Sequence, residues 1–223
     1  MTVDAVLFDL DETLVRYERP ASTVLAETFE ALDVEPFFEV GDFQERYEEF
    51  LPQSDTVDHL RELVFADIAA DSDREPALGR RLARRYATER DHSRVELLPG
   101  APPLLEALEE RPLGLVTNGD PAMQRPKLEA TGLDDRFDTV VYAGRDTASK
   151  PDAEPFERAL ADLSVDPPAG AFVGNDPVAD VSGAASVGLR SVWLRNGSSV
   201  EPDVEPDATV DCLDELLDTW LVE

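Results

Sequence analysis

The chain has 223 residues, 42% of them hydrophobic, which suits one full-sized domain or a main domain with a smaller second one. Its 49 acidic residues against 20 basic ones give a formal net charge of -29, which argues against nucleic-acid binding and against attachment to anionic lipid surfaces. One cysteine excludes an intrachain disulfide, and with no apolar run of about 20 residues and no signal-peptide pattern we expect a cytoplasmic protein without a membrane segment.

The first predicted element is a strand at 4–9, a short apolar run that ends in acidic residues and is typical of a strand buried on both faces. Similar apolar runs follow at 113–116, 139–143, 171–173 and 191–194. Helical patterns separate and follow these runs, at 101–110, 121–131, 155–163, 178–187 and 213–221. Strands that alternate with helices predict an α/β fold with a Rossmann-like parallel sheet and right-handed crossovers.

Residues 16–95 break this alternation, because they contain helical patterns and no convincing strand. The helical patterns lie at 22–32, 42–51, 56–71 and 75–91. The segment stands between the first and second predicted strands, so we expect an all-helical domain inserted into the α/β fold. The expected organisation is a Rossmann-like core formed by residues 1–15 and 96–223, with a helical domain formed by residues 16–95.

Two carboxylates, Asp9 and Asp11, stand just past the first predicted strand, where open α/β sheets bind their ligands. Carboxylates this close together repel each other unless a cation or a shared proton compensates their charge. The pair therefore indicates a metal-assisted site, although acidic residues at strand ends are also common as solvated or capping residues.

The second and third predicted strands are followed by groups that suit an anion. Thr117 and Asn118 offer a hydroxyl and an amide, and Gly119 lets the backbone approach a ligand closely. Lys150 follows the third strand, and lysine is an uncommon choice in this chain. The other lysine, Lys127, lies in the middle of a predicted helix and is interpreted as a solvated surface charge.

The scarcity of lysine is itself informative, since the remaining 18 basic residues are all arginines. A surface rich in Asp and Glu and poor in Lys suits high salt, where charge repulsion is screened over about 3 Å at 1 M. We therefore expect a halophilic protein, with an ordinary acidic protein as the alternative.

Acidic residues also follow the fourth predicted strand. Asp176 and Asp180 could complete an oxygen-ligand Mg²⁺ site together with Asp9. Asp176 equally suits the N-cap of a helix, with Pro177 at the first helical position. A carboxylate can serve as a cap and as a metal ligand, so the two interpretations are compatible.

Together these groups form an ordered set at the ends of four successive strands: Asp9-x-Asp11-x-Thr13, Thr117, Lys150-Pro151, Asp176 and Asp180. On this set the chain resembles the haloacid dehalogenase-like superfamily of hydrolases, in particular its phosphoglycolate phosphatase-like branch, from Val3 to about Leu194. The helical insertion takes the place of that family's C1 cap. The resemblance implies a Mg²⁺-dependent phosphatase that hydrolyses a small phosphorylated metabolite through an aspartyl-phosphate intermediate.

The resemblance also implies a role for each residue. Asp9 is the expected nucleophile that attacks phosphorus, and Asp11 is the expected general acid and then general base. Thr117 and Asn118 are expected to bind the transferring phosphoryl group, and Lys150 to offset negative charge on it and on Asp9.

The metal is expected to be held by the Asp9 carboxylate, the backbone carbonyl of Asp11 and a group after the fourth strand. Asn175 stands where the commonest form of the family's fourth motif has its first acid. We favour Asp176 over Asn175 as the ligand, because a carboxylate binds Mg²⁺ more strongly than an amide oxygen does. Asp180 is expected either to bind the metal or to hold its ligands in place.

Other functions share parts of this pattern. A phosphomutase of the β-phosphoglucomutase-like branch keeps both acids and a C1 cap, so it is the main alternative. A 2-haloacid dehalogenase is similar in its nucleophile and fold but lacks the second acid, and Asp11 argues against it. A receiver-like signalling module places its phosphorylated Asp after the third strand, where this sequence has Ala143 and Gly144.

Overall fold

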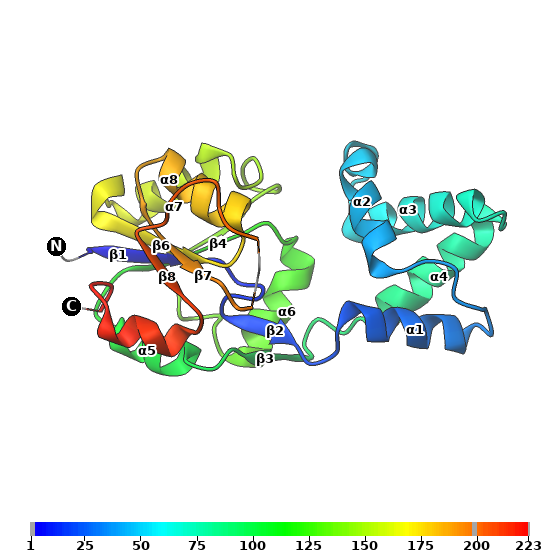
Figure 1. Cartoon of the computed structure of the whole chain (residues 1–223), viewed down its shortest axis with the longest axis horizontal. Coiled ribbons are helices and arrows are strands. Elements are labelled where there is room, and N and C mark those ends of the chain that lie inside the picture. The colour runs from blue at the N-terminus through cyan, green and yellow to red at the C-terminus, as the bar shows by residue number, and fades with distance from the viewer. Residues whose placement is uncertain (1–2, 198–199, 223) are drawn as a thin grey trace. The chain divides into compact units, whose positions relative to one another are not determined.

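The computed structural model describes residues 3–197 and 200–222, without the side chain of Glu48, and the chain divides into two compact units (Figure 1). The core unit comprises Met1–Arg16 and Val95–Glu223, and the helical unit comprises Tyr17–Arg94. The chain passes between the units at two short strands that pair with each other, β2 (Val15–Tyr17) and β3 (Val95–Leu97).

The core unit contains a six-stranded parallel sheet with the strand order β5-β4-β1-β6-β7-β8. Its strands are β1 (Ala5–Phe8), β4 (Leu113–Thr117), β5 (Thr139–Tyr142), β6 (Gly170–Gly174), β7 (Arg190–Leu194) and β8 (Ala208–Val210). From β1 the chain first builds the sheet in one direction through β4 and β5, and then builds it in the other direction from β6. The order therefore reverses at β1 and β6, which is where open α/β sheets form their ligand crevice.

Helices cover both faces of this sheet (Figure 1). They are α5 (Ala101–Ala107), α6 (Pro121–Thr131), α7 (Ala153–Leu163) and α8 (Gly183–Ser186), with short helical turns η2 (Pro167–Ala169), η3 (Pro177–Ser182) and η4 (Leu213–Asp218). Val6 and Phe8 pack into one hydrophobic cluster and Leu7 into another, because successive residues of a strand point to opposite faces. The two-sided burial confirms the predicted α/β class with a parallel sheet.

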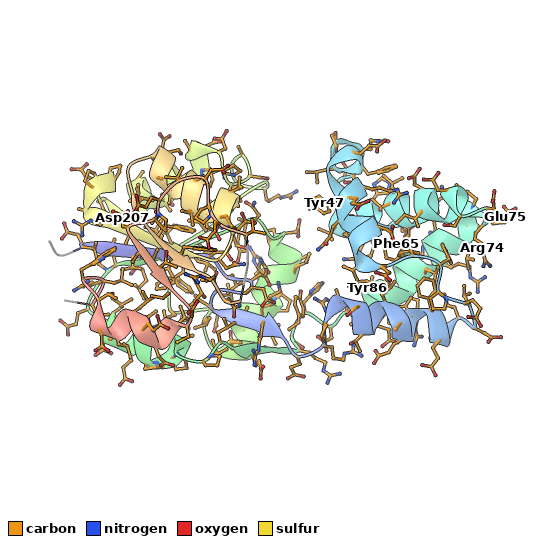
Figure 2. All side chains as sticks on the ribbon, in the orientation of Figure 1. Tyr47, Phe65, Arg74, Glu75, Tyr86 and Asp207 are labelled. Atoms are coloured by element: carbon orange, nitrogen blue, oxygen red, sulfur yellow. The ribbon has the colours of Figure 1, made fainter. Side chains whose placement is uncertain are left out.

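The helical unit has its own core. It consists of α1 (Ala21–Ala31), α2 (Val40–Phe50), α3 (Val57–Asp71) and α4 (Pro76–Glu89), with the short turn η1 (Leu51–Gln53) after α2. Phe38 lies edge-to-face on Phe65, with 4.8 Å between the ring centroids, and Phe65 packs in the same way on Tyr86 at 6.0 Å. Figure 2 labels Phe65 and Tyr86. These contacts place the aromatic residues of the insertion in the unit's own core.

The structure differs from the sequence-based expectation in a few short elements. The helix expected at 178–187 is a wide turn, η3, followed by the short α8, because the N–H groups of Asp180 and Val181 both bond to the carbonyl of Asp176. Strand β8 was not expected, since its three residues follow an acidic, Pro-containing loop and are too few for a periodic pattern. No helix within the described residues is long and apolar enough to cross a bilayer.

Candidate active site

The residues singled out in the sequence come together at the carboxyl ends of the central strands. Asp9 directly follows β1, Thr117 is the last residue of β4, and Asp176 lies two residues past β6. β1 pairs with both of the other strands, so their ends meet at the point where the strand order reverses. Lys150 reaches the same place from the segment between β5 and α7.

Lys150 is the centre of a buried charge cluster. Its Nζ donates to Asp9 Oδ1 at 2.8 Å, to Asp180 Oδ1 at 2.7 Å and to the carbonyl oxygen of Val116 at 2.8 Å. An ammonium group has three donors, so these acceptors engage all of them. A phosphoryl group bound here would therefore be attracted by the positive charge of Lys150, but all three N–H groups of Lys150 are already engaged.

The two carboxylates of this cluster outnumber its single cation, and the pKa values reflect this. The pKa of Asp9 is raised from its ordinary value of 3.8 to about 7, and burial is the largest cause. The nearby Lys150 lowers this pKa, but by less than burial and Asp180 together raise it. Burial alone would lower the pKa of Lys150, but Asp180 and Asp9 outweigh it and hold that pKa above its usual value. The fold thus supplies less positive charge than ionised Asp9 needs.

Asn118 positions Lys150 through the backbone. The side-chain amide of Asn118 donates from Nδ2 to the carbonyl oxygen of Lys150 at 3.0 Å and accepts from its N–H at 2.8 Å. This amide is therefore committed to Lys150, and the expected contact of Asn118 with a phosphoryl group would have to come from its backbone.

The segment after β6 presents Asp176 from a tight turn. Asp176 Oδ1 accepts from the N–H groups of Val178 and Ala179 at 2.8 and 2.7 Å, so the residue is the expected helix cap. The backbone N–H of Asp176 in turn donates to Asp180 Oδ2 at 2.9 Å. A Cβ atom at Gly174 would lie 2.4 Å from Asp180 Cγ, so only glycine admits this approach.

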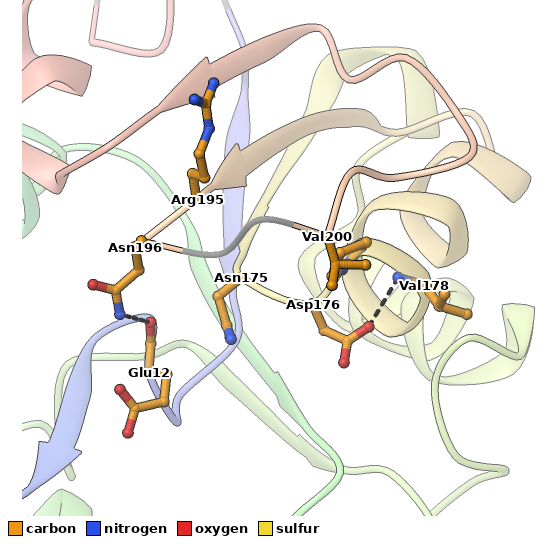
Figure 3. A pocket seen from close by; sticks show the side chains of 9 residues that line it. Glu12, Asn175, Asp176, Val178, Arg195, Asn196 and Val200 are labelled. Carbon is orange, nitrogen blue, oxygen red and sulfur yellow. Dashed lines mark hydrogen bonds between the residues drawn. The ribbon is translucent and has the colours of Figure 1, made fainter.

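Asn175 has different hydrogen-bond partners from Asp176. Its Oδ1 accepts from the Thr13 hydroxyl at 3.0 Å, and its carbonyl oxygen accepts from the indole N–H of Trp193 at 3.1 Å. Asn175 and Asp176 both line an open cavity of about 620 Å³ together with Glu12, Arg195 and Asn196 (Figure 3). Both candidate metal ligands therefore face accessible space.

Asp11 has partners that the sequence analysis missed. Lys127 Nζ donates to Asp11 Oδ1 at 2.6 Å, and Gln124 Nε2 donates to Asp11 Oδ2 at 2.8 Å. The interpretation of Lys127 as a solvated surface charge is wrong, because the residue is completely buried on the inner face of α6. Its spacing of three from Gln124, on the helix that follows Thr117, was the available signal.

Thr117 is also buried and is held by its neighbours. Its Oγ1 accepts from Gln124 Nε2 at 2.7 Å and from the N–H of Gly119 at 3.2 Å. Because both of these bonds are accepted, the hydroxyl proton of Thr117 remains for donation to another group.

The donor set is compatible with a divalent cation. No group of three His, Cys, Asp or Glu side chains lies close enough to hold a metal within residues 3–197 and 200–222. The set implied for Mg²⁺ needs only two carboxylates, Asp9 and Asp176, with one backbone carbonyl, and hard oxygen ligands with open positions suit this ion. A cation bound by these groups would offset the charge of Asp9, because Lys150 is shared between Asp9 and Asp180.

Known proteins with related sequences or structures are named as phosphatases and as a dehalogenase. A phosphoserine phosphatase from Thermus thermophilus is 31% identical over 242 residues, which cover 95% of this chain and 96% of the relative. A ribulose-1,5-bisphosphate 5-phosphatase from Halopiger xanaduensis is 32% identical over 215 residues, covering 92% and 87%. The solved structure of a 2-haloacid dehalogenase from Pseudomonas syringae has a TM-score of 0.68 at 27% identity and 96% coverage of both chains.

A family model settles the relationship, since the one for haloacid dehalogenase-like hydrolases matches residues 3–188. This match includes both parts of the core that carry the candidate site and the whole helical unit. The chain belongs to the haloacid dehalogenase-like family of hydrolases.

Proposed function

We propose that this protein is a Mg²⁺-dependent phosphatase that hydrolyses a small phosphate monoester through a phosphoryl group carried on Asp9. The observation that carries the proposal is the buried arrangement of Asp9 against Lys150, with a second acid, Asp11, two residues away. The curated relatives described above are named as phosphatases, which supports the same class. Because those two relatives are named for different esters, we propose a class of substrate and no single compound.

In the first step Asp9 attacks phosphorus. Lys150 holds Oδ1, so we assign the attack to Oδ2. The new Oδ2–P bond forms as the bond from phosphorus to the leaving oxygen breaks, and its electron pair stays on that oxygen. Asp11 donates a proton to the leaving oxygen, and Lys150 offsets the charge that gathers around Asp9 and the phosphoryl oxygens.

In the second step water removes the phosphoryl group from Asp9. Asp11, now a carboxylate, takes a proton from the water as its oxygen bonds to phosphorus. The Asp9–P bond breaks, inorganic phosphate leaves and both carboxyl groups return to their starting states. A carboxylate nucleophile thus divides one difficult displacement into two easier ones.

The phosphoryl group is held by donors at the end of β4. The Thr117 hydroxyl, whose oxygen already accepts two bonds, donates its proton to a phosphoryl oxygen. The backbone N–H of Asn118 is assigned as a further donor, because the Asn118 side chain is committed to Lys150 and the N–H of Gly119 to Thr117.

We assign Mg²⁺ to the carboxylates of Asp9 and Asp176 and to the backbone carbonyl of Asp11. When bound, the ion supplies positive charge that lets an anionic nucleophile approach an anionic phosphate. Asp180 is assigned the role of holding these ligands, because its two oxygens bind Lys150 and the N–H of Asp176. We further assign the helical unit the role of a C1 cap, since it is inserted directly after the strand that leads to Asp9.

The similarity to a 2-haloacid dehalogenase raises a second candidate function. Displacement of a halide ion needs no proton donor, yet this chain holds Asp11 with two buried side chains. We therefore expect no halide release from 2-haloacids, and a halide product with no phosphate product would reverse the assignment. A phosphomutase would use the same acids and would be recognised by isomer formed in place of phosphate released.

The proposal is tested by measuring phosphate released from p-nitrophenyl phosphate with and without Mg²⁺. Asp9→Asn should abolish release and Asp11→Asn should reduce turnover by about a thousandfold or more, while both variants stay folded. Asp4→Asn removes an exposed carboxylate just before β1 and serves as the matched control, with activity unchanged. Activity of Asp9→Asn near that of the wild type would refute the proposal.

A further inference from the structure

The two lysines of this chain have similar environments. Each is buried and contacts a different carboxylate of the Asp9–Asp11 pair. Lys150 lies 2.8 Å from Asp9, and Lys127 lies 2.6 Å from Asp11. Both lysines are nearly or fully inaccessible to solvent, while the other 18 basic residues of the chain are arginines. Lysine is the compact point charge of the two residue types, so it fits where a guanidinium would be too large.

Gln124 is the second partner of Asp11 and links it to Thr117. Its Nε2 donates to Asp11 Oδ2 at 2.8 Å and to Thr117 Oγ1 at 2.7 Å, and the residue is completely buried. When Asp11 is ionised, as in the second step, it only accepts hydrogen bonds, so the amide must turn its NH₂ group toward it. This orientation leaves Gln124 Oε1 without a partner among the described residues, which costs stability.

The backbone opposite Gln124 is shaped to admit it. A Cβ atom at Gly119 would lie 2.0 Å from Gln124 Nε2, so any larger residue would displace the amide. The helix that carries both side chains, α6, starts from a defined point, because Asp120 caps it by accepting from the N–H of Ala122 at 2.8 Å. Gln124 and Lys127 are three residues apart and therefore share one face of this helix.

Stability alone does not explain this arrangement. Lys127 loses its hydration completely in this ion pair, while the Asp11 side chain stays 39% exposed, so the attraction has to offset the desolvation of a buried ammonium and is weakened by solvent on the carboxylate. Here the fold adds an amide oxygen without a partner among the described residues and a glycine whose missing side chain leaves room for this amide. The cost is explained if the orientation of the Asp11 carboxylate matters for the chemistry.

We infer that Lys127 and Gln124 are positioning residues that fix the Asp11 carboxylate for proton transfer. This inference rests on the proposed function. Each partner engages one oxygen of Asp11, and every carboxylate oxygen has two acceptor sites, so a site remains on each for the proton that Asp11 gives or takes. Loss of either partner lets the carboxylate rotate and lowers the rate of the proton-transfer steps.

The test compares two esters that differ in how much they need a proton. The p-nitrophenolate group leaves phosphorus readily without one, whereas the phenolate of phenyl phosphate is a poorer leaving group and depends on the general acid. The value of kcat/KM reports formation of the phosphoryl-enzyme for both esters. We expect Lys127→Met to lower kcat/KM by about a hundredfold for phenyl phosphate and by less than about tenfold for p-nitrophenyl phosphate.

Arg125→Met is the matched control, because it removes a positive charge from an exposed position on the same helix and should leave both values unchanged. If Lys127→Met does not fold, Gln124→Leu is measured in its place and should change the ratio of the two values in the same direction. An equal loss for both esters, or no loss, overturns the inference while leaving the phosphatase intact. If the wild type releases no phosphate from either ester, the proposed function fails and the inference fails with it.

Discussion

The buried cluster at the end of β1 holds two carboxylates and one ammonium group, so its charges do not cancel. Asp9 and Asp180 both bind Lys150. Removing the ammonium would leave two unpaired buried charges, which is among the costliest changes a fold can suffer. Ionised Asp9 is therefore a group that the metal-free fold destabilises, and this is expected of a residue kept for its reactivity.

The pKa of Asp9 predicts how its replacement changes stability with pH. Between its ordinary value of 3.8 and the raised value of about 7, the unfolded chain loses a proton that the folded protein keeps, so the stability of the wild type falls as pH rises through this range. Asp9→Asn lacks this titration. We expect the stability of Asp9→Asn relative to the wild type to increase from about pH 4 to about pH 7 and to stay constant above that.

Urea unfolding in the presence of EDTA measures this difference, followed by circular dichroism. Asp4→Asn is the control, since that carboxylate is exposed. A difference between Asp9→Asn and the wild type that does not vary with pH would contradict the role assigned to burial.

Gly119 offers a way to disturb Gln124 without changing it. In Gly119→Ala the new methyl group would overlap the amide, so Gln124 must swing away from Asp11 and Thr117. We expect kcat/KM for phenyl phosphate to fall by about tenfold or more, because part of the general acid–base contribution is lost. Gly41→Ala is the control, since a Cβ atom there meets nothing within 4 Å and should leave activity unchanged. Equal kinetics in the two variants would contradict the account.

The sequence predicted some contacts between single residues and missed others. Asp9 and Lys150 were predicted to act together, and the structure places them 2.8 Å apart, while their chemical roles remain predictions. Lys127 was misinterpreted because its partner, Asp11, is 116 residues away in the sequence, and the spacing of Lys127 from Gln124 indicates only that the two share a helix face. An ion pair between distant segments is a property of the tertiary structure.

At the scale of elements, the turn after β6 combines structural and chemical tasks. Asp176 uses Oδ1 to cap η3, while the same carboxylate is our candidate ligand for Mg²⁺. An amide oxygen can replace a carboxylate oxygen as a cap, but it binds Mg²⁺ more weakly. The two tasks can therefore be separated by substitution.

We expect Asp176→Asn to keep the stability of the wild type within about 0.5 kcal/mol and Asp176→Ala to lose about 1 kcal/mol, because only alanine removes the cap. Both should weaken activation by Mg²⁺ by at least about tenfold, since even changes around a metal ligand cost that much. Thermal unfolding and Mg²⁺ titration of activity measure the two effects. Asn175→Ala is made beside them, and a larger loss of Mg²⁺ activation in that variant would assign the metal to Asn175.

Long elements were predictable and short ones were not. Helix α6 was expected at 121–131 and is found there, because Pro121 and Gly132 mark its ends. β8 and the paired strands β2 and β3 have three residues each, so neither alternation nor length distinguishes them from loops. Whether these short segments form strands depends on the neighbouring strands with which they pair.

At the scale of the whole molecule, the negative charge is unevenly divided. The core unit has 30 of the 49 acidic residues and 10 of the 20 basic ones, so it carries about twice the net charge of the helical unit. Two of those basic residues, Lys127 and Lys150, are buried in ion pairs and do not offset charge at the surface. Repulsion within the core unit should therefore be strong in dilute buffer.

This distribution supports our proposal that the protein is adapted to high salt. We expect its melting temperature to rise by at least about 5 °C between dilute buffer and about 2 M KCl, which corresponds to somewhat more than 1 kcal/mol of stability for a chain of this size. Sorbitol at equal osmolality is the control, because it excludes itself from the surface without screening charge. A melting temperature that is already high in dilute buffer and insensitive to KCl would contradict the proposal.

The Asp11→Asn variant can show whether Asp9 carries the phosphoryl group. This variant cannot activate water, but p-nitrophenolate leaves without needing a proton, so the first step should still occur while the second stalls. We predict a burst of about one equivalent of p-nitrophenolate per protein chain with Mg²⁺ present, and a phosphorylated peptide containing Asp9 after acid quenching, identified by mass spectrometry. Steady release of phosphate with neither a burst nor a phosphorylated Asp9 would contradict the account.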